Sequence, residues 1–174
     1  MTYKASTVPP ESPPEAIPGV LSTETRRKID RLRARYPVAR SALIPSLLIA
    51  QEEAGYLPAP VITEIGRIFG MHPNEVFDVA SFYTMLFKKP VGRHVLAVCT
   101  NISCLLCNCE DVIGHIRKRL GIAPGETTAD GRFSLMEVEC LASCDTAPVM
   151  QVSNRSYYDN LTPEKVDQIL DSLE

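Results

Sequence analysis

The apolar pattern of the chain changes period at the segment Pro90–Val91–Gly92, and this change constrains the fold more than any other feature. Before it, over residues 21–88, apolar side chains recur every three or four positions, as on one face of a helix. After it, over residues 89–174, short apolar runs of strand type alternate with helical stretches. We therefore expect an α+β fold in which an N-terminal helical bundle precedes an α/β domain. Residues 1–20 hold five of the 14 prolines, which predicts a disordered, Pro-rich tail.

Four helices are predicted in the bundle. They run from Ser22 or Thr23 to Pro37, from Ser41 to Gly55 with Pro45 in the first turn, from about Pro60 to Gly70, and from Pro73 onward. The serines and the threonine are candidate N-caps, and Pro37, Gly55 and Gly70 are the candidate C-terminal ends of the first three helices. The apolar residues at helical spacing are expected to form the core, and they are Ile29, Leu32, Tyr36, Leu47, Leu48, Ala50, Ile62, Ile65, Ile68, Phe69, Val76, Phe77, Ala80, Tyr83 and Met85.

The apolar pattern of residues 89–174 predicts strands that alternate with helices. Strands are expected at residues 94–99, 133–139, 149–152 and 157–158, and helices at 110–120 and from Pro163 to the end. Thr162 is the candidate cap of the last helix, with Val166, Ile169, Leu170 and Leu173 as its buried stripe. The order strand–helix–strand–strand–strand–helix fits a small α/β sandwich of thioredoxin-like type.

Four cysteines follow predicted strands in two close pairs. Cys99 and Cys104 have four residues between them, and Cys140 and Cys144 have three. Neighbouring parallel strands end at the same edge of a sheet, so the two pairs are expected to converge there. Six cysteines in 174 residues are too few for a disulfide scaffold. The N-terminal residues lack a secretory pattern, which favours a reducing compartment and metal-binding, catalytic or buried cysteines.

Spacing alone leaves several kinds of thiol site open. All-thiolate sites select zinc or iron–sulfur clusters, and the small Ala142 and Ser143 would let backbone N–H groups approach inorganic sulfide. An iron–sulfur cluster is therefore favoured over structural zinc. A redox dithiol formed by Cys104 and Cys107, and ordinary buried cysteines, are the remaining alternatives. Cys107 and Cys109 are expected to be buried, and either of them replacing Cys104 as a ligand is a further alternative.

Charge and hydropathy exclude some partners. The formal net charge is -3, without the basic face that nucleic-acid binding needs. No apolar stretch approaches the roughly 20 residues of a membrane span, so we expect no direct membrane insertion.

Five segments together resemble a known family. The chain resembles the small thioredoxin-like [2Fe–2S] subunit of the NADH dehydrogenase module of respiratory complex I, and related subunits of NAD-reducing hydrogenases and formate dehydrogenases. The segments are LLIAQEEAGYL (47–57), VASFYTMLF (79–87), VCTNISCLLC (98–107), GETTADGRFSLMEVECLASCDTAPVMQV (125–152) and YYDNLTPEKVDQIL (157–170). The chain departs from the family pattern at Asn108, where a glycine is frequent; Asn tolerates a left-handed backbone, so the turn is expected to survive.

The resemblance implies a thioredoxin-like ferredoxin domain over residues 89–174 with one [2Fe–2S] cluster. It implies Cys99, Cys104, Cys140 and Cys144 as the ligands and no catalytic residue. It also implies a partner subunit that binds FMN and NADH, so that this chain has no independent NADH site. The expected function is single-electron transfer from reduced FMN in an NADH:quinone oxidoreductase, located in the cytoplasm or peripherally on the cytoplasmic side of the inner membrane.

Two other functions stay open from the sequence. The chain could serve a NAD-dependent hydrogenase or formate dehydrogenase, or it could be a zinc-stapled structural adaptor. For the segment 79–87 we hypothesise that some of Phe82, Tyr83, Met85 and Phe87 pack on the flavin subunit, because one face of a short helix cannot bury them all.

Overall fold

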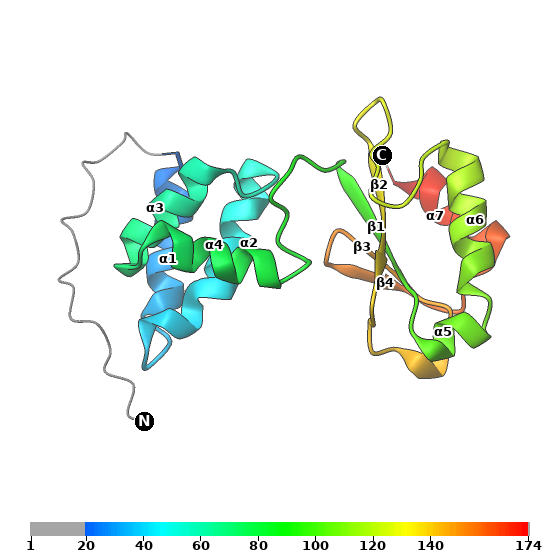
Figure 1. Ribbon diagram of the computed structural model, residues 1–174, viewed down its shortest axis with the longest axis horizontal. Coiled ribbons are helices and arrows are strands. Elements are labelled where there is room, and N and C mark those ends of the chain that lie inside the picture. Colours follow the sequence, from blue (N-terminus) through cyan, green and yellow to red (C-terminus); the bar gives the residue numbers. More distant parts are fainter. Residues whose placement is uncertain (1–19, 174) are drawn as a thin grey trace, which may run out of the picture. The chain divides into compact units, whose positions relative to one another are not determined.

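The structure, a computed structural model, describes residues 20–173. The predicted Pro-rich tail falls almost wholly outside the described residues. The chain divides into two compact units between Lys89 and Pro90 (Figure 1). Each unit has its own hydrophobic core. The first is all helical and the second contains the sheet, so the predicted α+β fold is confirmed.

The first unit is a helical bundle. Its elements are α1 (Thr23–Arg33), a short 3-10 helix η1 (Ala39–Ala42), α2 (Leu43–Ala54), α3 (Ala59–Phe69) and α4 (Pro73–Phe82). Their apolar faces meet in one buried cluster, which includes Ile29, Leu47, Ala50, Val61, Ile65, Val76, Ala80 and Leu86. The burial of apolar side chains on one side of each helix is the main stabilising contribution here.

Two helix starts show which local signals were reliable. Ser22 caps α1 as predicted, because its Oγ accepts a hydrogen bond from the N–H of Thr25 at 3.2 Å. The predicted cap at Ser41 is wrong. Ser41 lies inside the 3-10 helix η1, which runs directly into α2, so Ala42 occupies the N-cap position without a side-chain bond.

The predicted burial of Tyr36, Phe77 and Met85 is wrong, since all three are exposed. Tyr36 lies beyond the end of α1, so the helical period no longer places it over the core. The segment that follows α4 is bound by the side chain of Gln51 in α2. Nε2 of Gln51 donates to the carbonyl of Met85 at 3.0 Å, and Oε1 accepts from the N–H of Phe87 at 2.6 Å. The residue between them, Leu86, is thereby turned into the core.

The second unit is a four-stranded sheet with helices. Its elements are β1 (His94–Cys99), α5 (Ile102–Leu106), α6 (Cys109–Leu120), β2 (Phe133–Val138), the 3-10 helix η2 (Cys144–Thr146), β3 (Met150–Val152), β4 (Ser156–Tyr158) and α7 (Pro163–Ser172). The strand order is β2-β1-β3-β4, with β1 parallel to β2 and the other pairs antiparallel. The predicted order of elements is confirmed, and α5 is an addition that the sequence did not predict.

The core of this unit lies between the sheet and two helices. Helix α6 packs against β1, β2 and α7 (Figure 1). Leu96 of β1 and Ile116 of α6 are fully buried. The stripe predicted for α7 is confirmed, because Val166, Ile169 and Leu170 are buried in the same cluster and Leu173 packs against it. Among residues 20–173, no helix is long and apolar enough to cross a membrane.

Gly92 allows the chain to enter β1 close to β2. Its N–H donates to Oγ of Ser134 at 2.7 Å. A Cβ at this position would lie 2.6 Å from the backbone carbon of Phe133, too near for any side chain. The break in the apolar pattern therefore contains a glycine for a steric reason.

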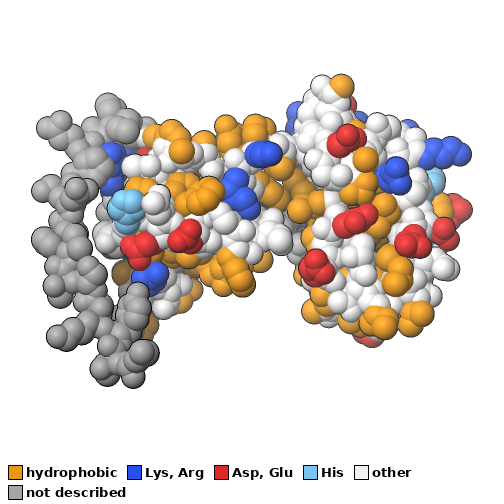
Figure 2. All heavy atoms as spheres, in the orientation of Figure 1, with side chains coloured by type: hydrophobic (Ala, Val, Ile, Leu, Met, Phe, Trp, Pro, Cys, Tyr) orange, Lys and Arg blue, Asp and Glu red, His pale blue; other side chains and the backbone are white. Residues whose placement is uncertain are grey.

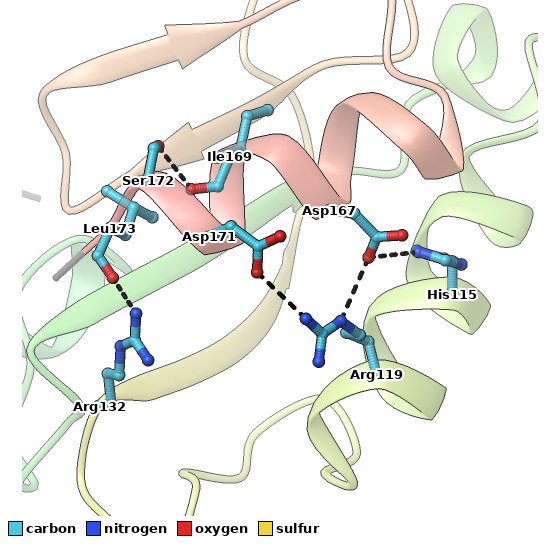
Figure 3. Close-up of polar contacts among 8 residues, drawn as sticks. All are labelled: His115, Arg119, Arg132, Asp167, Ile169, Asp171, Ser172 and Leu173. Atoms are coloured by element: carbon cyan, nitrogen blue, oxygen red, sulfur yellow. Dashed lines mark hydrogen bonds and ion pairs between the residues drawn. The ribbon is translucent and has the colours of Figure 1, made fainter.

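Polar side chains join α6 to α7 at the edge of the core (Figure 3). Nε2 of His115 lies 2.9 Å from Oδ1 of Asp167. Arg119 reaches the same carboxylate with Nε at 3.4 Å and Asp171 with Nη2 at 3.1 Å. These contacts link two helices that are about 50 residues apart in the chain.

Candidate metal centre

The two cysteine loops lie at one edge of the sheet because β1 and β2 are parallel. Cys99, the last residue of β1, is paired with Val138, the last residue of β2. The N–H of Thr100 donates to the carbonyl of Val138 at 3.0 Å. Nδ2 of Asn101 donates to the carbonyl of Glu139, also at 3.0 Å. The first loop is therefore hydrogen-bonded to the chain that leads directly into Cys140.

Val149, which directly precedes β3, contacts the first cysteine loop on its buried side. The N–H of Cys99 donates to the carbonyl of Val149 at 3.0 Å. Val149 is fully buried and belongs to one cluster with Cys99, Cys104 and Cys109. Leu141 and Ala147 pack against this cluster, so apolar groups surround the three sulfur atoms.

Burial favours the protonated form of two of these thiols, those of Cys104 and Cys109. Loss of hydration raises the pKa of Cys104 to about 11, and a hydrogen bond with the Cys99 thiol adds to the effect, whereas a hydrogen bond from the backbone of Val149 opposes it. Burial also raises the pKa of Cys109. Because metals bind the thiolate, metal binding at Cys104 must release a proton.

The second cysteine pair is exposed and sits in a tight loop. Cys140 Sγ accepts a hydrogen bond from the N–H of Ala142 at 3.3 Å. Ala142 itself has a left-handed backbone with φ 57°. Cys144 begins η2, and the hydroxyls of Ser143 and Thr146 are 2.9 Å apart across that turn. An N–H directed at cysteine sulfur is the kind of contact that stabilises a ligating thiolate.

The four predicted ligands share one edge, but the structure does not gather them into a closed site. Within the described part of the chain, no three His, Cys, Asp or Glu side chains are close enough to hold a metal ion. Cys99 and Cys104 are buried, whereas Cys140 and Cys144 are exposed. Four thiols on two adjoining loops are nevertheless the donor set that iron–sulfur clusters and structural zinc select.

The two remaining cysteines differ from each other. The expectation that both are buried is correct for Cys109 and wrong for Cys107, which is exposed. Between them, Asn108 has φ 62° and ψ 43°, so the predicted left-handed turn is confirmed. The sequence reasoning missed that Cys109 shares a cluster with Cys99. The signal was present, because Cys109 precedes Val112, Ile113 and Ile116 of α6 at helical spacing.

A redox dithiol of Cys104 and Cys107 does not fit this geometry. An attacking thiol needs an accessible sulfur and a lowered pKa. Cys104 is buried and its pKa is raised. The thiols at this edge are therefore suited to holding a metal centre rather than to thiol exchange.

The sequence matches a described family over residues 29–174, that of the thioredoxin-like [2Fe-2S] ferredoxins. The chain belongs to this family. For a thioredoxin-like [2Fe–2S] ferredoxin, the predicted cofactor and the predicted thioredoxin-like fold are confirmed, and electron transfer is its class of function. The resemblance stated from the motifs is confirmed as well.

Relatives of this ferredoxin come from several bacteria. The E 2 subunit of the NADH-quinone oxidoreductase of Rhizobium meliloti (strain 1021) is 46% identical over 148 residues, which cover 85% of this chain and 88% of the relative. The NADH-quinone oxidoreductase subunit 2 of Thermus thermophilus is 42% identical, over 80% of this chain and 78% of the relative.

A solved structure of an NAD+-reducing [NiFe]-hydrogenase in the H2-reduced state is also similar. The TM-score is 0.64 at 25% sequence identity, over 74% of this chain. This ferredoxin spans only 22% of the hydrogenase chain, so the similarity concerns one part of that larger protein.

Proposed function

We propose that this chain is the [2Fe–2S] electron-transfer subunit of an NADH-oxidising, flavin-containing complex, namely an NADH:quinone oxidoreductase. Cys99, Cys104, Cys140 and Cys144 are the proposed ligands. The observation that carries the proposal is the parallel pairing of β1 with β2, which brings both cysteine loops to one edge. The two relatives named as NADH-quinone oxidoreductase subunits support this choice of parent complex.

The protein contributes ligation, shielding and hydrogen bonds at this edge. When bound, a [2Fe–2S] cluster accepts and returns one electron at a time. Val149, Leu141 and Ala147 cover the buried thiols and lower the local dielectric. The N–H of Ala142 is directed at Cys140 and would stabilise negative charge on that sulfur. These residues therefore tune the electron affinity of the site without reacting themselves.

FMN and NADH are assigned to a partner subunit in this proposal. Large apolar side chains that remain exposed are candidates for its contact surface. Phe82 is 79% exposed and Met85 is 40% exposed, whereas Phe87 is half-buried. In the second unit, Ile102, Leu105 and Leu106 of α5 are exposed close to Cys104. Figure 2 shows acidic and basic side chains scattered among apolar ones on the face it presents.

Replacing Cys140 by Ala tests the ligand set. The native chain, purified without oxygen, should contain two irons and two acid-labile sulfides and give one spin-half signal after reduction, as a [2Fe–2S] cluster does. Cys140→Ala should lose this iron, because a three-thiolate site leaves one iron without its ligand. The matched control is Cys107→Ala, which removes an exposed thiol outside the ligand set. Unchanged iron in Cys140→Ala would refute the assignment, and one zinc per native chain would favour a structural adaptor.

A NAD-dependent hydrogenase or formate dehydrogenase is the second candidate parent complex. The similarity to the NAD+-reducing hydrogenase supports it. Isolation of the native complex through a tag on this chain would distinguish the candidates. Quinone reduction by NADH supports the first proposal, and hydrogen- or formate-dependent NAD+ reduction supports the second. The proposed location is peripheral, on the cytoplasmic side of the inner membrane through the complex.

A further inference from the structure

Helix α6 has an exposed face that the proposed redox site does not use. The face borders a surface hollow of about 450 Å³, which we call the α6 hollow. The residues that line it from the helix and its C-cap recur at spacings of three, four and seven positions, and they are Gly114, Arg117, Lys118 and Gly121. Ile122 and Glu126 line it from the loop that follows. The hollow lies toward the C-terminal end of α6, whereas the cysteine loops adjoin its first residue, Cys109.

Three consecutive cations lie near the end of α6, and they differ in their partners. Arg119 is bound to two aspartates of α7. Over residues 20–173, neither Arg117 nor Lys118 has an ion pair or a side-chain hydrogen bond, and both are exposed. The carboxylate of Glu126 accepts a hydrogen bond from the N–H of Ala123 at 2.7 Å. Two cations against one carboxylate that already has a donor give the hollow an excess of positive charge.

Gly114 lies inside α6, where glycine destabilises a helix relative to alanine. Its backbone is not left-handed, and a Cβ at this position would meet no atom within 4 Å. The packing of the chain itself therefore gives no reason for a glycine here. Gly121 differs, because it ends the helix with φ 69° and glycine suits that conformation. An open strip of backbone beside two unpaired cations is suited to the close approach of another chain.

We propose that the α6 hollow binds an acidic segment of a partner protein. In this arrangement the backbone of the segment passes over Gly114, and its carboxylates bind Arg117 and Lys118. From Gly114 to Gly121 the helix rises about 10 Å, which matches a short peptide segment better than a single small anion. Exposed cations also hold a free anion weakly, whereas a partner that covers this face excludes water from the ion pairs. The inference goes beyond the proposed function and does not depend on the cluster ligands.

Zero-length cross-linking of the native complex tests the contact. The complex is isolated through a tag on this chain and treated with a carbodiimide, which joins an amine to a carboxylate only where the two touch. Peptide mass spectrometry should show Lys118 linked to an Asp or Glu of a different protein. Acetylation of Lys118 should also be slower by about tenfold or more in the complex than in the isolated chain, because a covered amine reacts slowly.

Substitutions then test which features of the hollow matter. The dissociation constant is measured between this chain and the protein cross-linked to it, both purified. Arg117→Gln/Lys118→Gln should weaken binding by about tenfold or more, since it leaves the partner's carboxylates unpaired. The matched control Arg27→Gln/Arg31→Gln removes two exposed cations of α1 and should leave the constant unchanged.

Gly114→Ala separates close approach from simple charge attraction. The added methyl group meets open space in this chain, so the urea midpoint of the isolated variant should rise. Binding should nevertheless weaken by about tenfold, because the methyl group occupies the space of the partner's backbone. Unchanged binding by this variant overturns the proposal.

The remaining outcomes are equally decisive. Lys118 that reacts as fast in the complex as in the isolated chain overturns the proposal, as does a cross-link only within this chain or to a second copy of it. If inorganic phosphate protects Lys118 of the isolated chain as well as the complex does, the hollow is a small-anion site and the proposal is wrong. A complex that does not oxidise NADH, but in which Lys118 is linked to an acidic segment, would instead refute the proposed function and leave this inference standing.

Discussion

Ala142 has a backbone conformation that few residues with a Cβ adopt. Its φ is 57°, in the left-handed region, and its N–H lies 3.3 Å from Sγ of Cys140. Such a conformation costs an L-residue about 1–2 kcal/mol. The loop retains it because turning the amide of Ala142 back toward Cys140 gives the sulfur a hydrogen-bond donor. Local strain beside a proposed cluster ligand would thus be coupled to the chemistry of the site.

Ala142→Gly should therefore stabilise the chain and keep the cluster. Glycine adopts the left-handed region readily, and its greater freedom in the unfolded chain offsets only part of the gain, so we expect the free energy of unfolding to rise by about 0.5–1 kcal/mol. Urea unfolding and iron content of the purified protein measure the two effects. Ala142→Val is the control, which should lower the free energy of unfolding because a β-branched residue is strained at positive φ. A less stable Ala142→Gly would contradict this account.

At the scale of elements, α6 and α7 are joined by charged side chains as well as by their apolar faces (Figure 3). The hydrogen bond from His115 is the main cause that holds the pKa of Asp167 below its ordinary value, and the charges of His115 and Arg119 contribute, whereas burial opposes them. A carboxyl group whose pKa is lowered by folding stabilises the fold above its ordinary pKa. That stabilisation is lost as the pH falls through the lowered value.

Asp167→Asn should accordingly lower stability near neutral pH and matter less in acid. We expect the urea midpoint of the variant to lie below that of the native chain at about pH 7, and the difference to shrink below about pH 4, the ordinary value for Asp. Both proteins are compared without metal, so that loss of the cluster in acid does not contribute. Asp78→Asn, an exposed carboxylate on α4, is the control. A difference that stays constant with pH would show that Asp167 acts through packing and not through its charge.

At the scale of the whole molecule, the chain consists of two units with separate cores. The clusters around Leu47 and Ile65 in the first unit and around Leu96 and Ile116 in the second share no residue. All six cysteines lie after Pro90. We propose that residues 21–88 and 89–174 are separate domains, and that the second one carries the redox site by itself.

A fragment of residues 90–174 should fold alone and hold the cluster. We expect one cooperative unfolding transition, because the sheet, α6 and α7 form a complete core within the fragment. Its iron content per chain should equal that of the full chain. Far-UV circular dichroism during urea unfolding and an iron assay measure these properties. A fragment that unfolds without a transition, while the full chain unfolds cooperatively, would show that the second unit depends on the first.

Much of the element pattern could be read from the sequence, because apolar spacing and caps are local signals. The strands at 94–99 and 133–138, the cap at Ser22 and the left-handed turn at Asn108 follow from residues a few positions apart. The convergence of Cys99 with the Cys140 loop also followed, since parallel strands end at one edge. Helix α5 was missed because five residues are too few to show a helical period.

Sequence by itself therefore determined most of the elements, their order, and which family the chain belongs to, whereas η1 and α5 were seen only in the structure. Only the tertiary structure decided which apolar and sulfur-bearing side chains are buried. Gln51, more than 30 residues away in the chain, turns Leu86 inward and leaves Met85 outside. The packing of α6 on the sheet likewise buries Cys109 and leaves Cys107 exposed. Burial depends on contacts between segments that are distant in the chain, and a local sequence pattern does not show which distant segments will be in contact.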